Sequence, residues 1–243
     1  MMSTGIAEVA AASGHEVVVR ARTQAGADSV VEGVRRSLDR QIEREHRSAQ
    51  ERDETLSRIS VTTELSDLAP VDLVIESVIE DLAVKLALFE ELDRVCVPGT
   101  ILATNTSTLP IVEMAMATGR PDKVCGIHFF NPATVMNLVE VVHPITASKE
   151  TVAVAIEFAE ACSKEVIEVK DTAGFVVNAL LFPYLNDAVR LLERGVASKE
   201  SIDKAMVGGC GFPMGPLALL DRPRSSGSAP RRPARSARRS SGR

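Results

Sequence analysis

Aromatic residues and cysteines are scarce in this sequence. The 243 residues include no tryptophan, one tyrosine, seven phenylalanines and four cysteines. The cysteines lie far apart and form neither a CxxC pair nor the Cys/His spacing of a zinc site; they are Cys96, Cys125, Cys162 and Cys210. We therefore expect reduced thiols, with no disulfide framework and no metal site.

Long hydrophobic runs are also missing. No stretch approaches the roughly 18 apolar residues of a transmembrane helix, and the most apolar helical segment, 175–185, contains Asn178 and Pro183. The N-terminal apolar stretch is short, follows no basic region and contains Glu8, so it lacks the pattern of a signal peptide. These absences predict a cytoplasmic protein without a membrane partner.

Basic residues are outnumbered by acidic ones over the first 221 residues, but not at the C-terminus. The net charge of −5 combines −13 over the first 221 residues with +8 over residues 222–243, which hold eight arginines and no acid. The acidic body argues against nucleic acid as a partner. The Arg/Ser/Pro/Ala/Gly tail cannot bury apolar surface, so we expect it to be disordered. A nucleic-acid-binding arm is the alternative, but the tail has no interleaved aromatic residues.

Strand-like segments alternate with helical ones as far as residue 170. Expected strands cover 15–20, 59–63, 71–78, 101–104, 124–130, 138–142 and 165–170. Expected helices cover 5–12, 25–47, 49–57, 84–95, 110–118 and 149–163. Helices of this length between strands are typical of βαβ units, so the pattern predicts an α/β fold with a doubly wound, mainly parallel sheet.

The pattern changes after residue 170. A long helix over 175–195 and a shorter one capped by Ser198 are expected there, with no further strand. We therefore expect an α/β domain over 1–170 with a helical hairpin at about 25–57, a helical domain over 171–221, and the tail. A doubly wound domain normally opens on a strand and a Gly-rich turn, whereas this chain opens directly on a helix.

Four polar features could carry chemistry. They are the cluster 103–108 after an expected strand, His128, Glu140 and Asn178. His128 lies near the end of one strand and Glu140 within the next, which predicts a His–carboxylate pair suited to proton transfer. The alternatives are a helix cap for the cluster, a core histidine, and a helix–helix hydrogen bond for Asn178.

Taken together, the segments resemble the 3-hydroxyacyl-CoA dehydrogenase family, particularly its bacterial members that act on 3-hydroxybutyryl-CoA. The matching text includes ATNTSTLPI, GIHFFNPATVMNLVEVV, DTAGFVVNALLFPYLNDAV and GGCGFPMGPLALLD, and it spans residues 5–221. The resemblance implies a Rossmann-like first domain and (S)-3-hydroxyacyl-CoA dehydrogenase activity. By this resemblance His128 is the general base, Glu140 orients it, and Ser107 and Asn178 bind the reacting oxygen and substrate.

The resemblance also implies cofactor and substrate contacts. The implied dinucleotide-binding residues are Gly5, Arg20, Arg22, Glu80, Lys85 and Asn105. The acyl-CoA substrate would meet Ser37 and Arg44 on the helical hairpin, where a cationic side chain suits a phosphate. The cofactor is NAD or NADP, because Ala21 stands where an acid usually holds the ribose and two arginines flank it. The family's helical domain implies a homodimer.

Two departures from the family pattern shape the remaining expectations. The first strand and the first two glycines of the dinucleotide turn are missing, and the helical domain gives way to the basic tail after Asp221. We expect a chain cut at both ends, by a lost initiator and a frame shift, that binds dinucleotide poorly. The alternative function is a catalytically dead truncated relative that keeps part of the fold. An enzyme for small hydroxy acids without CoA is disfavoured by the hairpin.

Overall fold

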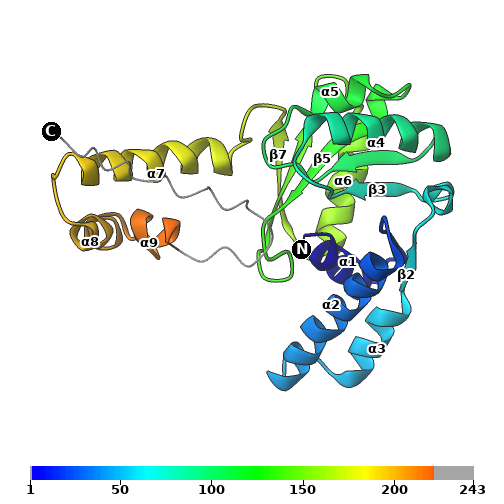
Figure 1. Cartoon of the computed structure of the whole chain (residues 1–243), viewed down its shortest axis with the longest axis horizontal. Helices are drawn as coiled ribbons and strands as arrows, with labels where there is room; N and C mark the ends of the chain where they lie inside the picture. Colours follow the sequence, from blue (N-terminus) through cyan, green and yellow to red (C-terminus); the bar gives the residue numbers. More distant parts are fainter. Residues whose placement is uncertain (1, 222–243) are drawn as a thin grey trace, which may run out of the picture. The chain divides into compact units, whose positions relative to one another are not determined.

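The computed structural model describes residues 2–221 (Figure 1). It contains two compact units, the first ending at Phe182 and the second beginning at Pro183. The boundary falls inside helix α7, 12 residues beyond the division expected at residue 170. The physical reason is that the backbone just before and at the start of α7 is hydrogen-bonded to the sheet of the first unit. The basic tail, expected to be disordered, lies outside the described residues.

The chain folds into alternating strands and helices up to β7 and into helices beyond it. The strands are β1 Val17–Arg20, β2 Ile59–Thr62, β3 Leu73–Glu76, β4 Ile101–Thr104, β5 Val124–Phe129, β6 Leu138–His143 and β7 Glu165–Lys170. The α-helices are α1 Met2–Ala12, α2 Gln24–Glu43, α3 Ala49–Ser57, α4 Leu82–Val95, α5 Ile111–Met116, α6 Lys149–Ala161, α7 Val177–Glu193, α8 Lys199–Cys210 and α9 Pro216–Leu220. Two short 3-10 helices cover Leu65–Leu68 and Pro121–Lys123.

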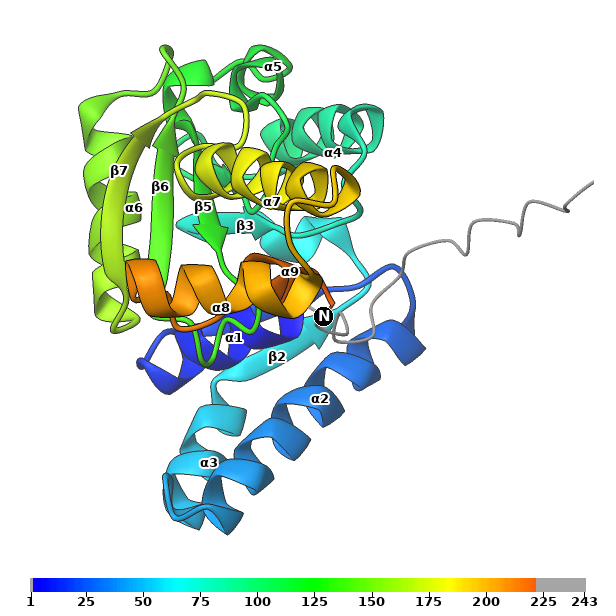
Figure 2. The same ribbon diagram turned by 90° about the vertical axis from the view of Figure 1, so that its left-hand side faces the viewer.

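The main sheet has five strands in the order β3-β4-β5-β6-β7, and only the β5–β6 pair is antiparallel. Figure 2 shows β7, β6 and β5 side by side with α6 along them. Alternate strand residues face two separate apolar clusters. One cluster joins Ala103, Ile127 and Val141 to α1 and α6, and the other joins Leu102, Val124 and Val142 to α4 and α5. Helices on both faces confirm the doubly wound α/β class.

The remaining two strands, β1 and β2, form a parallel sheet of their own. β1 and β3 are not hydrogen-bonded to each other, which agrees with the expected doubly wound sheet that lacks its first strand. The hairpin of α2 and α3 connects β1 to β2, and the two helices lie side by side (Figure 1). Thr23 caps α2, and Ser48 with Glu51 forms a capping box at α3.

The second unit contains the rest of α7 together with α8 and α9. Ser198 caps α8 as expected, and Gly211 ends it in the left-handed conformation with φ 71°. The Asp203 carboxylate accepts hydrogen bonds from the Leu217 and Ala218 amides at the start of α9. A small apolar cluster of Ala188, Ile202 and Leu217 holds these helices together.

Most expected elements are present with shifted ends. The strands at 101–104 and 165–170 have the expected bounds, whereas α2 ends at Glu43 instead of residue 47 because Glu45 adopts φ 58°. The expected helix over 175–195 covers Val177–Glu193 only, since Gly174 and Phe175 both have positive φ. The strand expected over 71–78 is confined to Leu73–Glu76. Helix α9 was not predicted.

No helix among residues 2–221 meets the length and hydrophobicity that a membrane crossing requires.

Candidate active site

The predicted pair of His128 and Glu140 is present at the antiparallel junction of the main sheet. His128 on β5 lies directly opposite Glu140 on β6, and Nδ1 of the imidazole lies 2.7 Å from Glu140 Oε2. The side chains are 5% and 0% exposed, respectively. Direct cross-strand neighbours on an antiparallel pair bring their side chains together, which explains the contact. Because Nδ1 is bound to Glu140, the imidazole can exchange a proton with a ligand only at Nε2.

Aromatic rings restrict the imidazole further. The His128 ring centroid lies 4.6 Å from that of Phe130 and 5.5 Å from that of Phe175. Phe130 directly follows β5, and Phe175 comes from the turn before α7. The ring is therefore held in one orientation by packing as well as by its hydrogen bond.

The second oxygen of Glu140 connects the pair to helix α7. Glu140 Oε1 accepts hydrogen bonds from the Val176 and Val177 amides at 3.1 and 3.0 Å. Burial raises the pKa of the Glu140 carboxyl, but the bonds from His128, Val177 and Val176 outweigh it and leave the pKa below its ordinary value. Glu140 is therefore a carboxylate at neutral pH, suited to stabilise an imidazolium.

The turn before α7 needs an unusual backbone. Gly174 has φ 77° and Phe175 has φ 52°, which turns the Val176 and Val177 amides towards Glu140. A Cβ atom on Gly174 would lie 2.9 Å from the Ala179 nitrogen, so only glycine fits there without strain. No sequence pattern predicts the positive φ of Phe175.

Ser107 and Asn178, the two residues to which the resemblance assigns substrate contacts, are in contact with each other. Asn178, in the first turn of α7, donates from Nδ2 to the Ser107 carbonyl at 3.3 Å. The Ser107 amide in turn donates to Glu80 Oε1 at 2.9 Å. The neighbouring Val177 amide is bonded to Glu140. The first turn of α7 therefore links Asn178 and Ser107 to the pair of His128 and Glu140.

A buried charged cluster supports the loop that carries Ser107. Lys85 donates to both Glu76 oxygens at 2.7 Å and lies 3.4 Å from Glu80 Oε2. Thr104 donates to Glu76, and Thr106 donates to Glu80. Lys85 is 1% exposed and Glu80 39%, so the Lys85 ammonium is in the interior while Glu80 reaches the surface.

Sequence reasoning missed Glu76, which is buried at the end of β3. A carboxylate inside the apolar run VDLVIESV, nine residues before a lysine, was the available signal. Asn105 follows β4, and its Oδ1 accepts a hydrogen bond from the Phe129 amide at 2.8 Å. The predicted Asn105 therefore joins the ends of β4 and β5.

The other predicted cofactor residues lie in the part of the first unit built around α1 and β1. Gly5 is on α1, where a Cβ would lie 3.2 Å from Ala133 Cβ. Arg20 donates from Nε to the Thr63 carbonyl at 3.2 Å, and Arg22 is exposed. Among the described residues, no hydrogen bond or ion pair joins these residues to Glu80, Lys85 or Asn105, so the two groups of predicted cofactor residues are not in direct contact.

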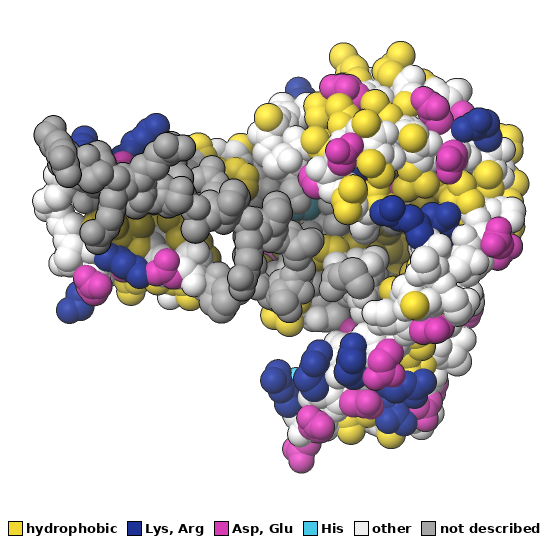
Figure 3. Space-filling view, viewed as in Figure 1, with side chains coloured by type: hydrophobic (Ala, Val, Ile, Leu, Met, Phe, Trp, Pro, Cys, Tyr) yellow, Lys and Arg dark blue, Asp and Glu magenta, His cyan; other side chains and the backbone are white. Residues whose placement is uncertain are grey.

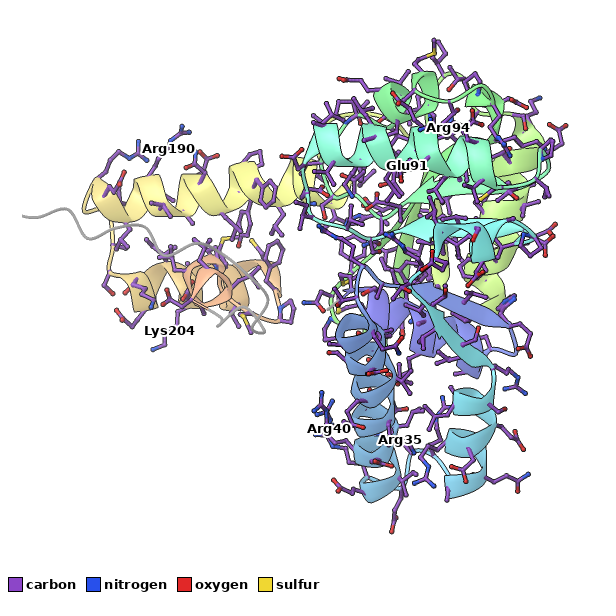
Figure 4. The ribbon with its side chains drawn as sticks, turned by 45° about the vertical axis from the view of Figure 1, so that its right-hand side comes forward. Arg35, Arg40, Glu91, Arg94, Arg190 and Lys204 are labelled. Carbon is purple, nitrogen blue, oxygen red and sulfur yellow. The ribbon has the colours of Figure 1, made fainter. Side chains whose placement is uncertain are left out.

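The predicted substrate residues on α2 differ in exposure. Ser37 is half-buried and hydrogen-bonds Glu8 on α1, whereas Arg44 is exposed at the end of the helix. Arginine side chains gather on this hairpin (Figure 3), and Arg40 projects to the outer side of α2 (Figure 4). Among residues 2–221 no group of three His, Cys, Asp or Glu side chains is placed to hold a metal ion.

Comparisons with known proteins give a consistent result. The chain matches the NAD-binding domain of 3-hydroxyacyl-CoA dehydrogenase over residues 1–172 and the C-terminal domain of that family over residues 174–224. It is 43% identical to a 3-hydroxybutyryl-CoA dehydrogenase of Clostridioides difficile over 220 residues, 90% of this chain and 78% of that protein. A protein of the same name from Mycobacterium tuberculosis is 46% identical over 226 residues, with the same coverages.

A solved structure supports the same assignment. The (S)-3-hydroxybutyryl-CoA dehydrogenase PaaH1 from Ralstonia eutropha superposes with a TM-score of 0.88 at 38% identity, covering 90% of this chain and 77% of that one. Both the sequence matches and the fold thus confirm the resemblance. The chain belongs to the 3-hydroxyacyl-CoA dehydrogenase family.

Proposed function

We propose that this chain is an (S)-3-hydroxyacyl-CoA dehydrogenase that interconverts a 3-hydroxyacyl-CoA, such as 3-hydroxybutyryl-CoA, and the 3-oxoacyl-CoA. The observation that carries the proposal is the buried His128–Glu140 pair, bonded through Glu140 to the backbone at the start of the helix that bears Asn178. Relatives named 3-hydroxybutyryl-CoA dehydrogenase support the substrate class. The division into a dinucleotide-binding domain over 1–170 and a helical domain over 171–221 is part of the proposal.

In the oxidation direction, His128 Nε2 takes the proton of the substrate hydroxyl while C3 gives up its hydride. The nicotinamide cofactor, when bound, supplies the hydride acceptor. Glu140 stabilises the imidazolium that forms, because its carboxylate is already bonded to Nδ1. Ser107 and Asn178 hydrogen-bond the oxygen at C3 and hold it towards Nε2. In reduction, His128 returns the proton to that oxygen.

The residues at the ends of β3 and β4 fit the nicotinamide part of the cofactor. Glu80 is partly exposed, and Ser107 and Asn105 lie beside it at the same edge of the sheet, where open α/β sheets bind ligands. NAD is the cofactor favoured by the family match. NADP is the alternative, because Arg20 and Arg22 flank Ala21 and provide positive charge instead of a carboxylate.

The acyl-CoA phosphates would meet the basic face of α2, with Arg44 as the predicted contact and Ser37 as the less accessible one. Replacing Arg44 by alanine should raise the KM for acetoacetyl-CoA without lowering kcat, and free CoA should compete with the substrate. If free CoA does not compete, the hairpin is not a CoA site. The cytoplasmic setting and the homodimer remain predictions that the described residues do not test.

Nicotinamide absorbance with acetoacetyl-CoA, measured on the full chain with NADH and with NADPH, tests the activity. A rate above the blank supports the proposal and identifies the cofactor. A folded protein without any rate would favour the alternative, a relative without turnover. The observation that favours this alternative is the break in the sheet between β1 and β3.

A further inference from the structure

One buried carboxylate near the proposed active site takes no part in the reaction described above. The Glu76 side chain at the end of β3 is 0% exposed. Its Oε1 accepts hydrogen bonds from the Val78 amide and Lys85 Nζ, and its Oε2 accepts from Lys85 Nζ and Thr104 Oγ1. A carboxylate this deeply buried needs a charged partner, and Lys85 is that partner.

The Lys85 ammonium lies between two carboxylates and does not bind them equally. Nζ lies 2.7 Å from each Glu76 oxygen but 3.4 Å from Glu80 Oε2. The attraction between two charges weakens with distance, and Glu76 is also the more buried of the two acids. The charge of Lys85 is therefore matched mainly by Glu76, and Glu80 is held by it only weakly.

The other oxygen of Glu80 is bound to the loop 105–110 between β4 and α5, which we call the Ser107 loop. Glu80 Oε1 accepts from the Ser107 amide at 2.9 Å and from Thr106 Oγ1. The Ser107 carbonyl accepts from Asn178 Nδ2 at 3.3 Å. If Lys85 paired with Glu80 as closely as it does with Glu76, the Glu80 carboxylate would shift towards the interior and away from the Ser107 loop.

We propose that Glu76 is a positioning residue for the reaction, because it holds the Lys85 ammonium away from Glu80. The Glu80 carboxylate then stays on the Ser107 loop and fixes the Ser107 amide. The inference rests on the proposed function, in which Ser107 hydrogen-bonds the oxygen at C3. Displacing such a group by about 1 Å costs on the order of 10²-fold in rate.

A purely structural role is the alternative for Glu76, since its ion pair joins β3 to α4. The two roles differ in the consequence of Glu76→Gln, which keeps the shape of the side chain and removes its charge. Under the structural role the protein loses stability and the Ser107 loop keeps its place. Under the positioning role Lys85 turns to Glu80, and the Ser107 amide loses its acceptor.

The Ser107 amide reports directly on the proposed role. In proton–nitrogen correlation NMR spectra of the full chain, Glu76→Gln should move the Ser107 amide proton upfield and speed its exchange about tenfold, because a hydrogen bond to a carboxylate is lost. Glu76→Asp keeps the charge but is one methylene shorter, so its exchange rate should be intermediate. The control, Asp93→Asn, breaks another ion pair of α4, with Arg120 at 2.6 Å, and should leave the Ser107 amide unchanged.

The reduction of acetoacetyl-CoA is the second measurement. Glu76→Gln should lower kcat by about tenfold to a hundredfold, whereas Asp93→Asn should keep the wild-type kcat. In a Ser107→Ala background, which lacks the hydroxyl that the loop presents, Glu76→Gln should lower kcat by at most about twofold. A structural role predicts the same loss in both backgrounds, so this coupling separates the two roles.

An unchanged Ser107 amide in Glu76→Gln would overturn the proposal, as would equal losses of kcat in the two backgrounds. If Glu76→Gln does not fold, Glu76→Asp decides alone, and exchange at the wild-type rate in that variant would overturn the proposal. A wild-type chain without turnover would count against the proposed function. The Ser107 amide would still show whether Glu76 keeps Glu80 on the loop, so the two failures are distinguishable.

Discussion

Two halves of the first unit differ in burial and in strand pairing. We call the part around β4, β5 and β6 the complete half and the part around α1, β1 and β3 the incomplete half. Every residue of β4 and β5 is buried and both strands are paired on each side, whereas β1 alternates between half-buried and exposed residues and β3 is mostly half-buried. The His128–Glu140 pair lies in the complete half, and the predicted residues Gly5, Arg20 and Arg22 lie in the incomplete half.

This difference separates two requirements of the proposed reaction. Proton transfer needs a rigid imidazole with a fixed partner, and a strand paired on both sides supplies that rigidity. Dinucleotide binding needs a helix N-terminus and strand ends aligned at one edge, which a split sheet aligns less well. The two halves should therefore respond differently to substitution.

The largest expected effect is in the complete half. His128→Gln should lower kcat for acetoacetyl-CoA reduction by about 10²–10⁴-fold, because the proton donor is lost. The Tm should change little, since glutamine can still hydrogen-bond Glu140. The matched control is His143→Gln at the other end of the strand pair, which should keep the activity. Equal loss in both variants would contradict the assignment of His128.

A second large effect, on stability, is expected at the buried ion pair of Lys85 and Glu76, which lies between the two halves. Lys85→Met leaves the Glu76 carboxylate buried without its cation and should lower the free energy of unfolding by about 3–5 kcal/mol. Combining it with Glu76→Gln should restore much of the loss, because both charges are then removed. Urea unfolding measures both. The exposed pair of Arg190 and Asp187 is the control, and Arg190→Ala should leave the midpoint unchanged. A double variant as unstable as Lys85→Met would refute the explanation by an unpaired charge.

The sequence predicted the complete half better than the incomplete one. His128 and Glu140 could be paired in advance because two short apolar strands place them at the same level, and β4 and β7 have the expected bounds. Their bond to α7 could not be predicted, since it depends on the positive φ of Phe175, for which the sequence has no signal. The unpaired edges of β1 and β3 were foreshadowed by the missing first strand, whereas the bounds of β1 and β3 were predicted less well.

An intermediate effect is expected at the turn that joins the sheet to α7. Gly174→Ala places a Cβ atom 2.9 Å from the Ala179 nitrogen at φ 77°, and the left-handed conformation alone costs about 1–2 kcal/mol. Because the same turn directs Val176 and Val177 to Glu140, kcat should fall as well. Gly209→Ala in α8 is the control, where no atom lies within 4 Å, and it should stabilise by up to about 1 kcal/mol. Thermal unfolding that ranks the two variants the other way would contradict the strain at Gly174.

The smallest effect compares two buried carboxylates, one in each half. Burial raises the pKa of Glu8 above its ordinary value of 4.5, although Ser37 and Gln41 hydrogen-bond it, whereas hydrogen bonds hold the pKa of Glu140 below 4.5. As pH rises from 4.5 through the higher folded pKa, ionisation of Glu8 should remove stability. As pH falls through the lower folded pKa, protonation of Glu140 should remove stability, which is complete above 4.5.

Urea midpoints of the wild type, Glu8→Gln and Glu140→Gln between pH 3 and pH 7 measure this contrast. Relative to the wild type, Glu8→Gln should become more favourable as pH rises, because it avoids the ionisation of a buried acid. Glu140→Gln should become less favourable over the same range, because the wild type gains its hydrogen-bonded carboxylate. Slopes of the same sign would show that the folded protein shifts the pKa values of both carboxyls in the same direction. The comparison between a complete and an incomplete half would then apply to strand pairing alone and not to the electrostatics around α1.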